Sequence, residues 1–134
     1  MSNYNIGDSA STTKIFSQDE VTYYCSKLSG DNNPIHYDQE AAKANGFERC
    51  LVPGIMVTSL FGGLLDSKLP GKGTIHLGQT AKFLKPVFID EQIRVVITIK
   101  SIREDKPILT FSTIIIKEND EIAIEGDAVV KYRL

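Results

Sequence analysis

The chain has 134 residues, of which 42% are hydrophobic and 24% are charged, and its formal net charge is −2 at pH 7. This length and composition are typical of one globular domain that buries its own core without a disulfide or metal staple. The charge balance argues against a nucleic-acid-binding protein, which normally carries a basic stripe.

Targeting signals are not visible in the sequence. The N-terminus is polar and lacks the basic start and apolar stretch of a signal peptide. The longest uncharged stretch, residues 50–65, is shorter than the ~18 apolar residues of a membrane-spanning helix. Cys25 and Cys50 follow no metal or redox spacing, so we interpret them as buried thiols in a reducing compartment. We therefore expect a cytoplasmic protein without membrane insertion.

The N-terminal half is predicted to be mainly helical. Residues 1–11 form a polar segment that we expect to be frayed, and residues 12–134 form the single domain, beginning with a short strand over 12–16. Ser17 and Glu20 form a capping box for a helix that ends at Gly30.

Two further helices are predicted before the strands begin. Asp38 is a candidate cap for a short helix over 39–45, which Gly46 ends. Pro53 is expected as the first residue of a helix that runs to about Lys68, because its missing N–H costs nothing there. This helix is apolar on nearly every side, so other structure must enclose it.

Strand patterns dominate the rest of the chain. We predict strands over 74–87, with a bend at Gly78, and over 92–102, 108–117 and 121–133. Short polar turns join the last three, which indicates antiparallel hairpins. The predicted fold class is therefore α+β, with an antiparallel sheet wrapped around the helix that follows Pro53. Dimerisation through an open edge strand would protect that edge.

The segment 29–38, Ser-Gly-Asp-Asn-Asn-Pro-Ile-His-Tyr-Asp, combines an acid and an imidazole in a turn. Pro34 disfavours helical backbone at the preceding residue, so Asp31 and His36 do not share one continuous helix. A loop can aim both side chains at one water molecule, which is the minimum for general acid–base chemistry. The same residues are also common in turns, and this purely structural interpretation stays open.

The same segment closely resembles the signature of the MaoC-like, or (R)-specific enoyl-CoA hydratase, family of hot-dog-fold enzymes. The resemblance continues in residues 51–56, Leu-Val-Pro-Gly-Ile-Met, and in residues 78–87, and it spans the chain from about Phe16. It is strongest to the short hydratases that supply polyhydroxyalkanoate precursors. Asp90-Glu91 stands where many members have Gly-Asp, which affects only that turn.

The resemblance implies a substrate and a set of roles. The substrate would be a trans-2-enoyl-CoA, which is hydrated to the (R)-3-hydroxyacyl-CoA. Asp31 would activate the water, and His36 would hold it and share in proton delivery. The backbone N–H of Gly54, at a helix start, would polarise the thioester carbonyl. The family also implies a homodimer, and no cofactor or metal is expected.

Other residues are weaker candidates. Gly62, Gly63 and Leu65 are candidates for an acyl pocket, although we favour close helix–strand packing as the reason for the two glycines. Lys82, Lys85 and Arg103 are candidates for binding CoA phosphates. His76 and Tyr37 are interpreted as structural residues.

Three alternatives to the hydratase stay open. A hot-dog acyl-CoA thioesterase would share the fold and the ligand but would release free CoA. A non-catalytic acyl-CoA-binding module would need no Asp–His pair. A dehydratase acting on (R)-3-hydroxyacyl thioesters of acyl-carrier protein would run the same chemistry in reverse.

Overall fold

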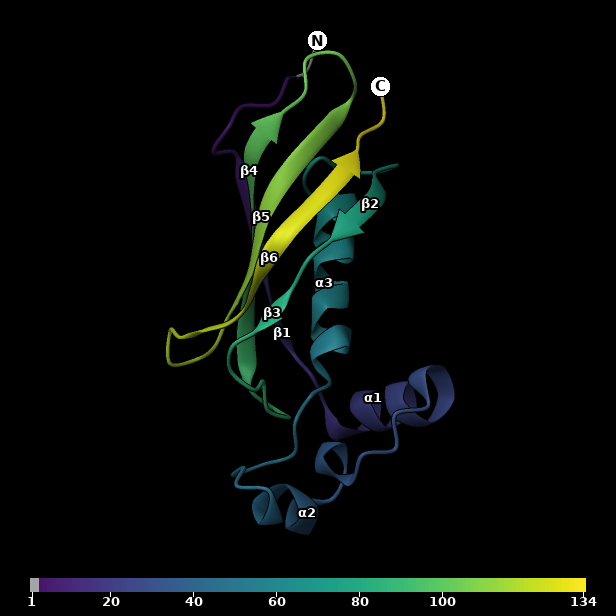
Figure 1. Ribbon diagram of the computed structural model, residues 1–134, viewed down its shortest axis with the longest axis vertical. Coiled ribbons are helices and arrows are strands. Elements are labelled where there is room, and N and C mark those ends of the chain that lie inside the picture. The colour runs from purple at the N-terminus through teal and green to yellow at the C-terminus, as the bar shows by residue number, and fades with distance from the viewer. Residues whose placement is uncertain (1–2) are drawn as a thin grey trace.

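The computed structural model describes residues 3–134. Figure 1 shows a long antiparallel sheet that curves beside helix α3, with α1 and α2 grouped at one end of the molecule. The sheet has six strands in the order β1-β4-β5-β6-β2, and β3 also pairs with β6. The strands are β1 (Ser9–Ile15), β2 (Ile75–Gln79), β3 (Lys82–Phe83), β4 (Gln92–Ile102), β5 (Ile108–Ile116) and β6 (Ile122–Lys131). The helices are α1 (Gln18–Tyr23), η1 (Tyr24–Ser29), η2 (Pro34–His36), α2 (Gln39–Ala44) and α3 (Gly54–Ser67).

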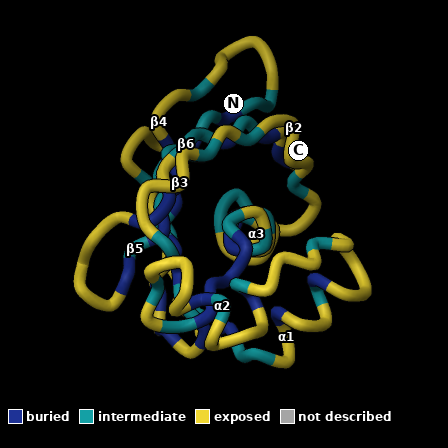
Figure 2. The backbone as a smooth tube through the Cα atoms, turned by 60° about the horizontal axis from the view of Figure 1, so that its bottom comes forward, coloured by how far each residue is buried: buried dark blue, intermediate teal, exposed yellow. Residues whose placement is uncertain are grey.

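The core lies between the inner face of the sheet and α3, where buried residues gather in Figure 2. Alternate residues of β4 point inward, and Ile93, Val95, Ile97 and Ile99 are each at most 1% exposed. Phe61 of α3, which has no exposed surface, packs into the same cluster. Each such fully buried aliphatic side chain contributes about 1.5–3 kcal/mol to folding relative to an exposed one. The period-two pattern of residues 92–102 is confirmed.

The sheet wraps around α3 as predicted, and within this chain it covers one side of the helix. Val57, Phe61 and Leu64 are buried against the sheet, but Ile55 is 64% exposed on another side of the helix. The sheet of one chain curves around only part of the cylinder, so the remaining apolar surface faces outward. Pro53 is the N-cap of this helix and not its first residue.

The first strand begins earlier than predicted. β1 starts at Ser9 and pairs with β4 from Ser9↔Thr98 to Ile15↔Gln92, so residues 9–11 are not frayed. The Ser9 hydroxyl also donates to the Ile97 carbonyl oxygen at 2.9 Å. Because β1 is an edge strand with mostly exposed side chains, the polar residues 9–11 at its start carried no strand signal.

The strand predicted over 74–87 is broken into β2 and β3. Both pair with β6, and the register shifts between His76 and Gly78, close to the predicted bend. The break lies where the backbone at Thr80 passes close to Gly126 of β6. A Cβ at Gly126 would come within 1.9 Å of the Thr80 carbonyl oxygen. Such a close approach between backbones requires glycine.

The helices before the sheet follow their predicted capping signals. Ser17 forms the capping box with Glu20, whose Oε1 accepts from the Ser17 N–H at 2.9 Å. After α1 the helix continues as the π-helical η1, and it ends at Gly30, which has φ +73°. Asp38 caps α2 by accepting from the Glu40 N–H at 3.0 Å. Within residues 3–134, no helix has the length and apolar character needed to cross a membrane.

Candidate active site

The loop between η1 and α2 aims Asp31 at His36. The Asp31 Oδ1 accepts a hydrogen bond from the Asn33 N–H at 3.1 Å, and this bond orients the carboxylate. Asn33 then caps η2 by accepting from the Ile35 N–H at 3.2 Å. His36 ends η2 one turn later, and its side chain points back toward the free Oδ2 of Asp31. The turn chemistry of the sequence is therefore what brings these two side chains together.

The two side chains lie within hydrogen-bonding range, and a backbone carbonyl assigns the imidazole tautomer. The His36 Nε2 is 3.2 Å from the Asp31 Oδ2, and the His36 Nδ1 is 2.8 Å from the Leu51 carbonyl oxygen. A carbonyl oxygen only accepts, so Nδ1 carries a proton. In the neutral ring Nε2 is then an acceptor that faces a second acceptor, the Asp31 carboxylate. Such a pair is satisfied by a shared proton or by a water molecule that donates to both groups.

The pair differs strongly in burial. His36 is buried, at 7% exposed, whereas the Asp31 side chain keeps 42% of its surface accessible. The imidazole is therefore held in one orientation by packing and by Leu51, while the carboxylate stays accessible to water. This combination suits a positioned acid and an accessible base.

A cavity of about 370 Å³ joins His36 to the start of α3. Among the described residues, no side chain caps α3, and the first N–H groups of a helix have no partner within it. Gly54 lines the cavity, and the Phe83 ring lies directly over its Cα, where a Cβ would come within 2.6 Å of the ring. The described residues that line this cavity are otherwise mainly apolar: Phe47, Leu51, Val52, Ile55, Val57, Phe83, Leu84, Lys85, Pro86, Val87 and Ile124.

The predicted acyl-pocket residues do not line this cavity. Leu65 is 1% exposed and belongs to the core. A Cβ at Gly62 would find only the His76 Nδ1 within 4 Å, at 3.6 Å, and one at Gly63 would find none of the described atoms. Close packing within the chain therefore does not explain the two glycines, and their acyl-pocket role stays a prediction.

The three predicted phosphate-binding residues lie at different places. Lys85 lines the cavity, with its Nζ 3.6 Å from Glu121 Oε2. Lys82 is exposed on β3 and lies in another groove. Arg103 follows β4 and pairs with Asp105 at 2.6 Å, at the end of the sheet opposite α1 and α2 (Figure 1). Of these three described residues, only Lys85 lines the cavity.

The remaining singled-out residues have structural partners. The His76 Nε2 is 2.9 Å from the Gln79 Oε1, and the Tyr37 hydroxyl donates to the Asn32 carbonyl oxygen at 3.4 Å. Cys25 and Cys50 are buried free thiols. Burial raises the pKa of the Cys25 thiol, and the Asp31 carboxylate adds to this rise. Burial also raises the pKa of Cys50, with a smaller effect from Asp38.

Two contributors to the site carried no signal in the sequence. The Leu51 carbonyl that orients His36 is a backbone group, so no side-chain pattern marks it. Phe83 belongs to a predicted strand, and only the fold places its ring against Gly54. Among residues 3–134, no three His, Cys, Asp or Glu side chains are grouped so that they could hold a metal ion.

Comparison with known proteins places these features in a family. Residues 6–119 match the family model described as MaoC like domain. The (R)-specific enoyl-CoA hydratase of Aeromonas caviae is 42% identical over 126 residues, which cover 94% of this chain and 93% of that protein. A mitochondrial 3-hydroxyacyl-[acyl-carrier-protein] dehydratase of Solanum lycopersicum is 40% identical and is covered over 74% of its length, with 92% of this chain.

The solved structures agree with this assignment. The structure of an (R)-hydratase from A. caviae involved in PHA biosynthesis superimposes with a TM-score of 0.95 at 40% identity. The match covers 99% of this chain and 100% of that one. With its antiparallel sheet wrapped on α3 and the Asp31–His36 loop beside Gly54, this chain has the hot-dog fold and belongs to the MaoC-like family of hydratases and dehydratases.

Proposed function

We propose that this protein is an (R)-specific enoyl-CoA hydratase, which adds water reversibly to a trans-2-enoyl-CoA. One observation carries the proposal: His36 lines a cavity together with Gly54, and its Nε2 lies 3.2 Å from the Asp31 carboxylate. The imidazole of an acid–base pair and an uncapped helix start face the same cavity, and hydration of an enoyl thioester requires both kinds of group. The (R) configuration of the product rests on the family resemblance.

The mechanism follows from where charge develops. The thioester carbonyl withdraws electrons from the double bond, so C3 is the carbon that water attacks. Asp31 accepts a proton from the water as the water oxygen bonds to C3, and His36 holds the water. The Asp31–His36 pair then delivers that same proton to C2, so that both groups return to their starting charge. The carbonyl oxygen gains negative charge, which the Gly54 N–H and the α3 dipole stabilise. One water is consumed, its hydroxyl on C3 and a proton on C2.

Dehydration of an acyl-carrier-protein thioester is the second candidate. The tomato relative named as such a dehydratase is 40% identical to this chain, nearly as similar as the A. caviae hydratase. Hydration and dehydration share one transition state, so the same residues would serve both directions. The two candidates differ in the carrier to which the acyl group is attached.

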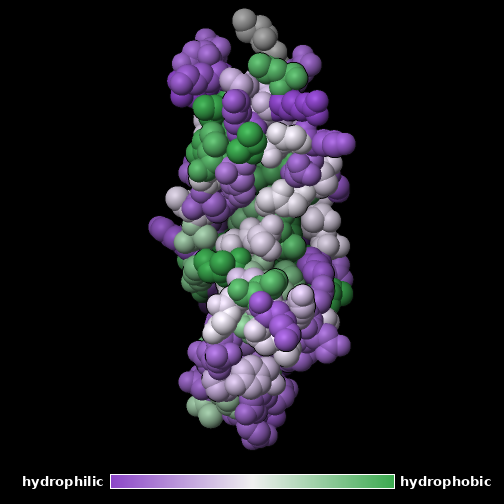
Figure 3. All heavy atoms as spheres, turned by 90° about the vertical axis from the view of Figure 1, so that its right-hand side faces the viewer, coloured by the Kyte–Doolittle hydropathy of each residue, from purple (hydrophilic) through white to green (hydrophobic). Residues whose placement is uncertain are grey.

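A homodimer is proposed through β2 and the outer side of α3. β2 is an edge strand, and Ile75 and Leu77 on it are 55% and 53% exposed. Ile55 on α3 is also more than half exposed. Figure 3 shows hydrophobic side chains interspersed among polar ones along the side of the molecule where β2 and α3 lie. A second copy would cover this surface and pair the open edge.

We propose a cytoplasmic location and a metabolic role from the two cysteines and from the A. caviae relative. Both cysteines are buried free thiols, as expected in a reducing cytoplasm. The similarity to an A. caviae hydratase involved in PHA biosynthesis supports a role in supplying polyhydroxyalkanoate precursors.

The wild-type protein tests the function directly with crotonyl-CoA. Hydration predicts a fall in absorbance at the enoyl-thioester band without free thiol, whereas a thioesterase would release CoA that reacts with a thiol reagent. Repeating the assay with crotonyl-acyl-carrier protein ranks the two carriers by kcat/KM. The dimer is tested separately by light scattering, for which a monomeric mass at assay concentration is the contradicting result.

A further inference from the structure

A buried ion pair lies beside the proposed site without taking part in the mechanism. The Lys117 Nζ is 2.9 Å from the Glu91 Oε1, and their side chains are only 6% and 5% exposed. Removing two charges from water is costly, and an apolar pair of similar volume is often as stable or more so. Stability alone therefore gives a weak reason for this pair.

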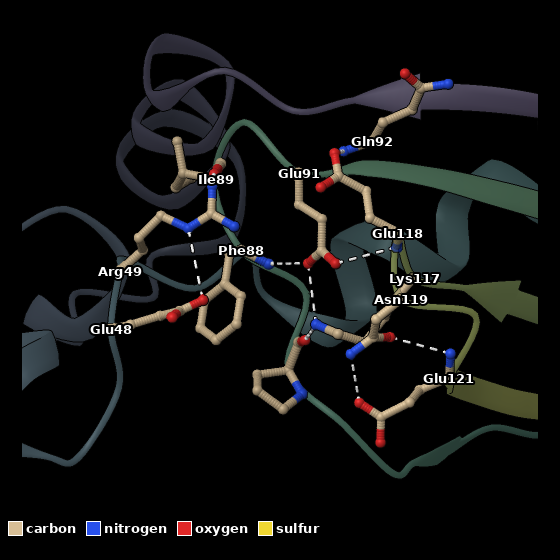
Figure 4. Close-up of polar contacts among 11 residues, drawn as sticks. Glu48, Arg49, Phe88, Ile89, Glu91, Gln92, Lys117, Glu118, Asn119 and Glu121 are labelled. Carbon is tan, nitrogen blue, oxygen red and sulfur yellow. Dashed lines mark hydrogen bonds and ion pairs between the residues drawn. The ribbon is translucent and has the colours of Figure 1, made fainter.

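Both partners also hold the backbone of residues 86–88. The Lys117 ammonium donates to the Pro86 carbonyl oxygen, and the Glu91 Oε1 accepts from the Phe88 N–H at 3.1 Å. The second carboxylate oxygen accepts from the Glu118 N–H at 3.3 Å, which ties the same turn to the end of β5. Figure 4 shows these contacts converging on the segment before β4.

Two cationic side chains, Lys117 and Arg49, lie near the Phe88 ring. The Lys117 Nζ lies 4.6 Å from the ring centroid, and the Arg49 Cζ lies 5.2 Å from it. Arg49 also donates from Nη1 to the Ile89 carbonyl oxygen at 3.0 Å. The segment from Pro86 to Ile89 is thus held by charged groups from two distant parts of the chain (Figure 4).

The held segment pairs with the residues that orient His36. The Val52 N–H donates to the Val87 carbonyl oxygen at 2.8 Å, and the Ile89 N–H donates to the Cys50 carbonyl oxygen at 3.0 Å. Between them, Leu51 forms a bridge with Phe88. The carbonyl of that same Leu51 accepts from the His36 Nδ1, and its N–H donates to the Ile35 carbonyl oxygen at 3.0 Å.

We propose that Glu91 and Lys117 are positioning residues, which set the Leu51 carbonyl and the start of α3 and thereby aim His36 and Gly54 at the substrate. The proposal rests on the proposed hydratase function. A continuous chain of contacts runs from the ion pair to Leu51, and only two residues separate Leu51 from Gly54. A shift of the 86–89 segment therefore moves both groups that act on the thioester.

The test compares three variants with a matched control. Lys117→Met and Glu91→Gln each remove one charge, and Lys117→Met/Glu91→Leu removes the pair without leaving a buried charge unpaired. Lys100→Met is the control, because Lys100 pairs with Asp127 at a similar distance, 2.8 Å, but both side chains are about half exposed. We measure kcat and KM with crotonyl-CoA well below each unfolding temperature, and the NMR signal of the His36 Nδ1 proton.

Positioning predicts that kcat falls on the order of 10- to 100-fold while KM changes by less than about threefold, since a displacement near 1 Å can cost that much. The His36 Nδ1 proton signal should shift or exchange faster in the same variants. The double variant should recover thermal stability toward wild type without recovering kcat. Lys100→Met should leave every quantity unchanged.

Unchanged kcat in the folded variants, or kcat that returns with stability in the double variant, would overturn the proposal. These outcomes are read against active wild-type protein. If wild-type protein itself fails to hydrate crotonyl-CoA, the proposed function fails instead, and the NMR signal of His36 still decides whether the ion pair orients the imidazole.

Discussion

Gly54→Ala is the substitution whose effect can be worked out most directly from the structure. The new Cβ would lie 2.6 Å from two atoms of the Phe83 ring, whereas ordinary contacts begin near 3.4 Å. The ring must therefore withdraw by about 0.8 Å. Phe83 is 53% exposed, so it can turn outward at a cost of about 0.5–1.5 kcal/mol.

Folding stability should change little in this variant. Gly54 is the first residue of α3, where alanine gains at most about 1 kcal/mol over glycine, and this gain offsets part of the cost of displacing the ring. Activity should fall much further, because the methyl group occupies the approach to the Gly54 N–H. A thioester carbonyl held about 1 Å from its proper place is expected to lower kcat/KM on the order of 100-fold.

The assay is hydration of crotonyl-CoA by Gly54→Ala, with thermal unfolding measured in parallel. The double variant Gly54→Ala/Phe83→Ala separates the clash with the Phe83 ring from the blocked approach to the Gly54 N–H. It removes the ring that the methyl group would meet but leaves the methyl group in front of the amide. We expect the double variant to remain impaired. A kcat/KM within about threefold of wild type in the single variant, with normal stability, would refute the placement of the carbonyl at Gly54.

Two further predictions concern ionisation and thiol chemistry. The hydrogen bond from Lys14, followed by the Ser17 N–H, lowers the pKa of Glu20 below its ordinary 4.5. The ionised Glu20 therefore stabilises the fold above pH 4.5, and this stabilisation is lost as the pH falls through the lower pKa of the folded state. The unfolding midpoint of Glu20→Gln should differ from that of wild type at pH 6 and converge with it at strongly acidic pH. A difference in midpoint that stays constant with pH would contradict this assignment. Because burial raises the pKa of Cys25 and Cys50, neither thiol should react with a chromogenic disulfide at pH 8 until the protein unfolds, and rapid reaction of the native protein would be inconsistent with their burial.

Local signals in the sequence predicted most of the fold. The alternation in residues 92–102 matches β4 at both ends, since a half-buried strand must expose every second side chain. The Ser17–Glu20 capping box and the Asp38 cap mark the starts of α1 and α2. Each of these features depends only on residues close together in the chain.

Features set by distant contacts could not be predicted. The polar residues 9–11 hid the start of β1, whose partner, β4, lies more than 75 residues later. The approach of Thr80 to Gly126 splits a strand that looked continuous. Asp90 also adopts the left-handed conformation, with φ +64°, which aspartate tolerates better than most residues.

Local motifs predicted some residues of the candidate site, whereas distant contacts place the others. Asp31, His36 and Gly54 were singled out from local motifs, and the structure places the first two in contact and lines the cavity with His36 and Gly54. The groups that hold them, such as the Leu51 carbonyl and the Glu91–Lys117 pair, come from elsewhere in the fold.

Separate Asp31→Asn and His36→Ala variants test the central claim most directly, by the kcat for hydration of crotonyl-CoA in protein whose fold is verified by circular dichroism. We predict that each substitution lowers kcat about 100-fold or more, because each removes a group that handles the proton of the attacking water. Hydration within a few fold of wild type in either variant would contradict the acid–base role of that residue.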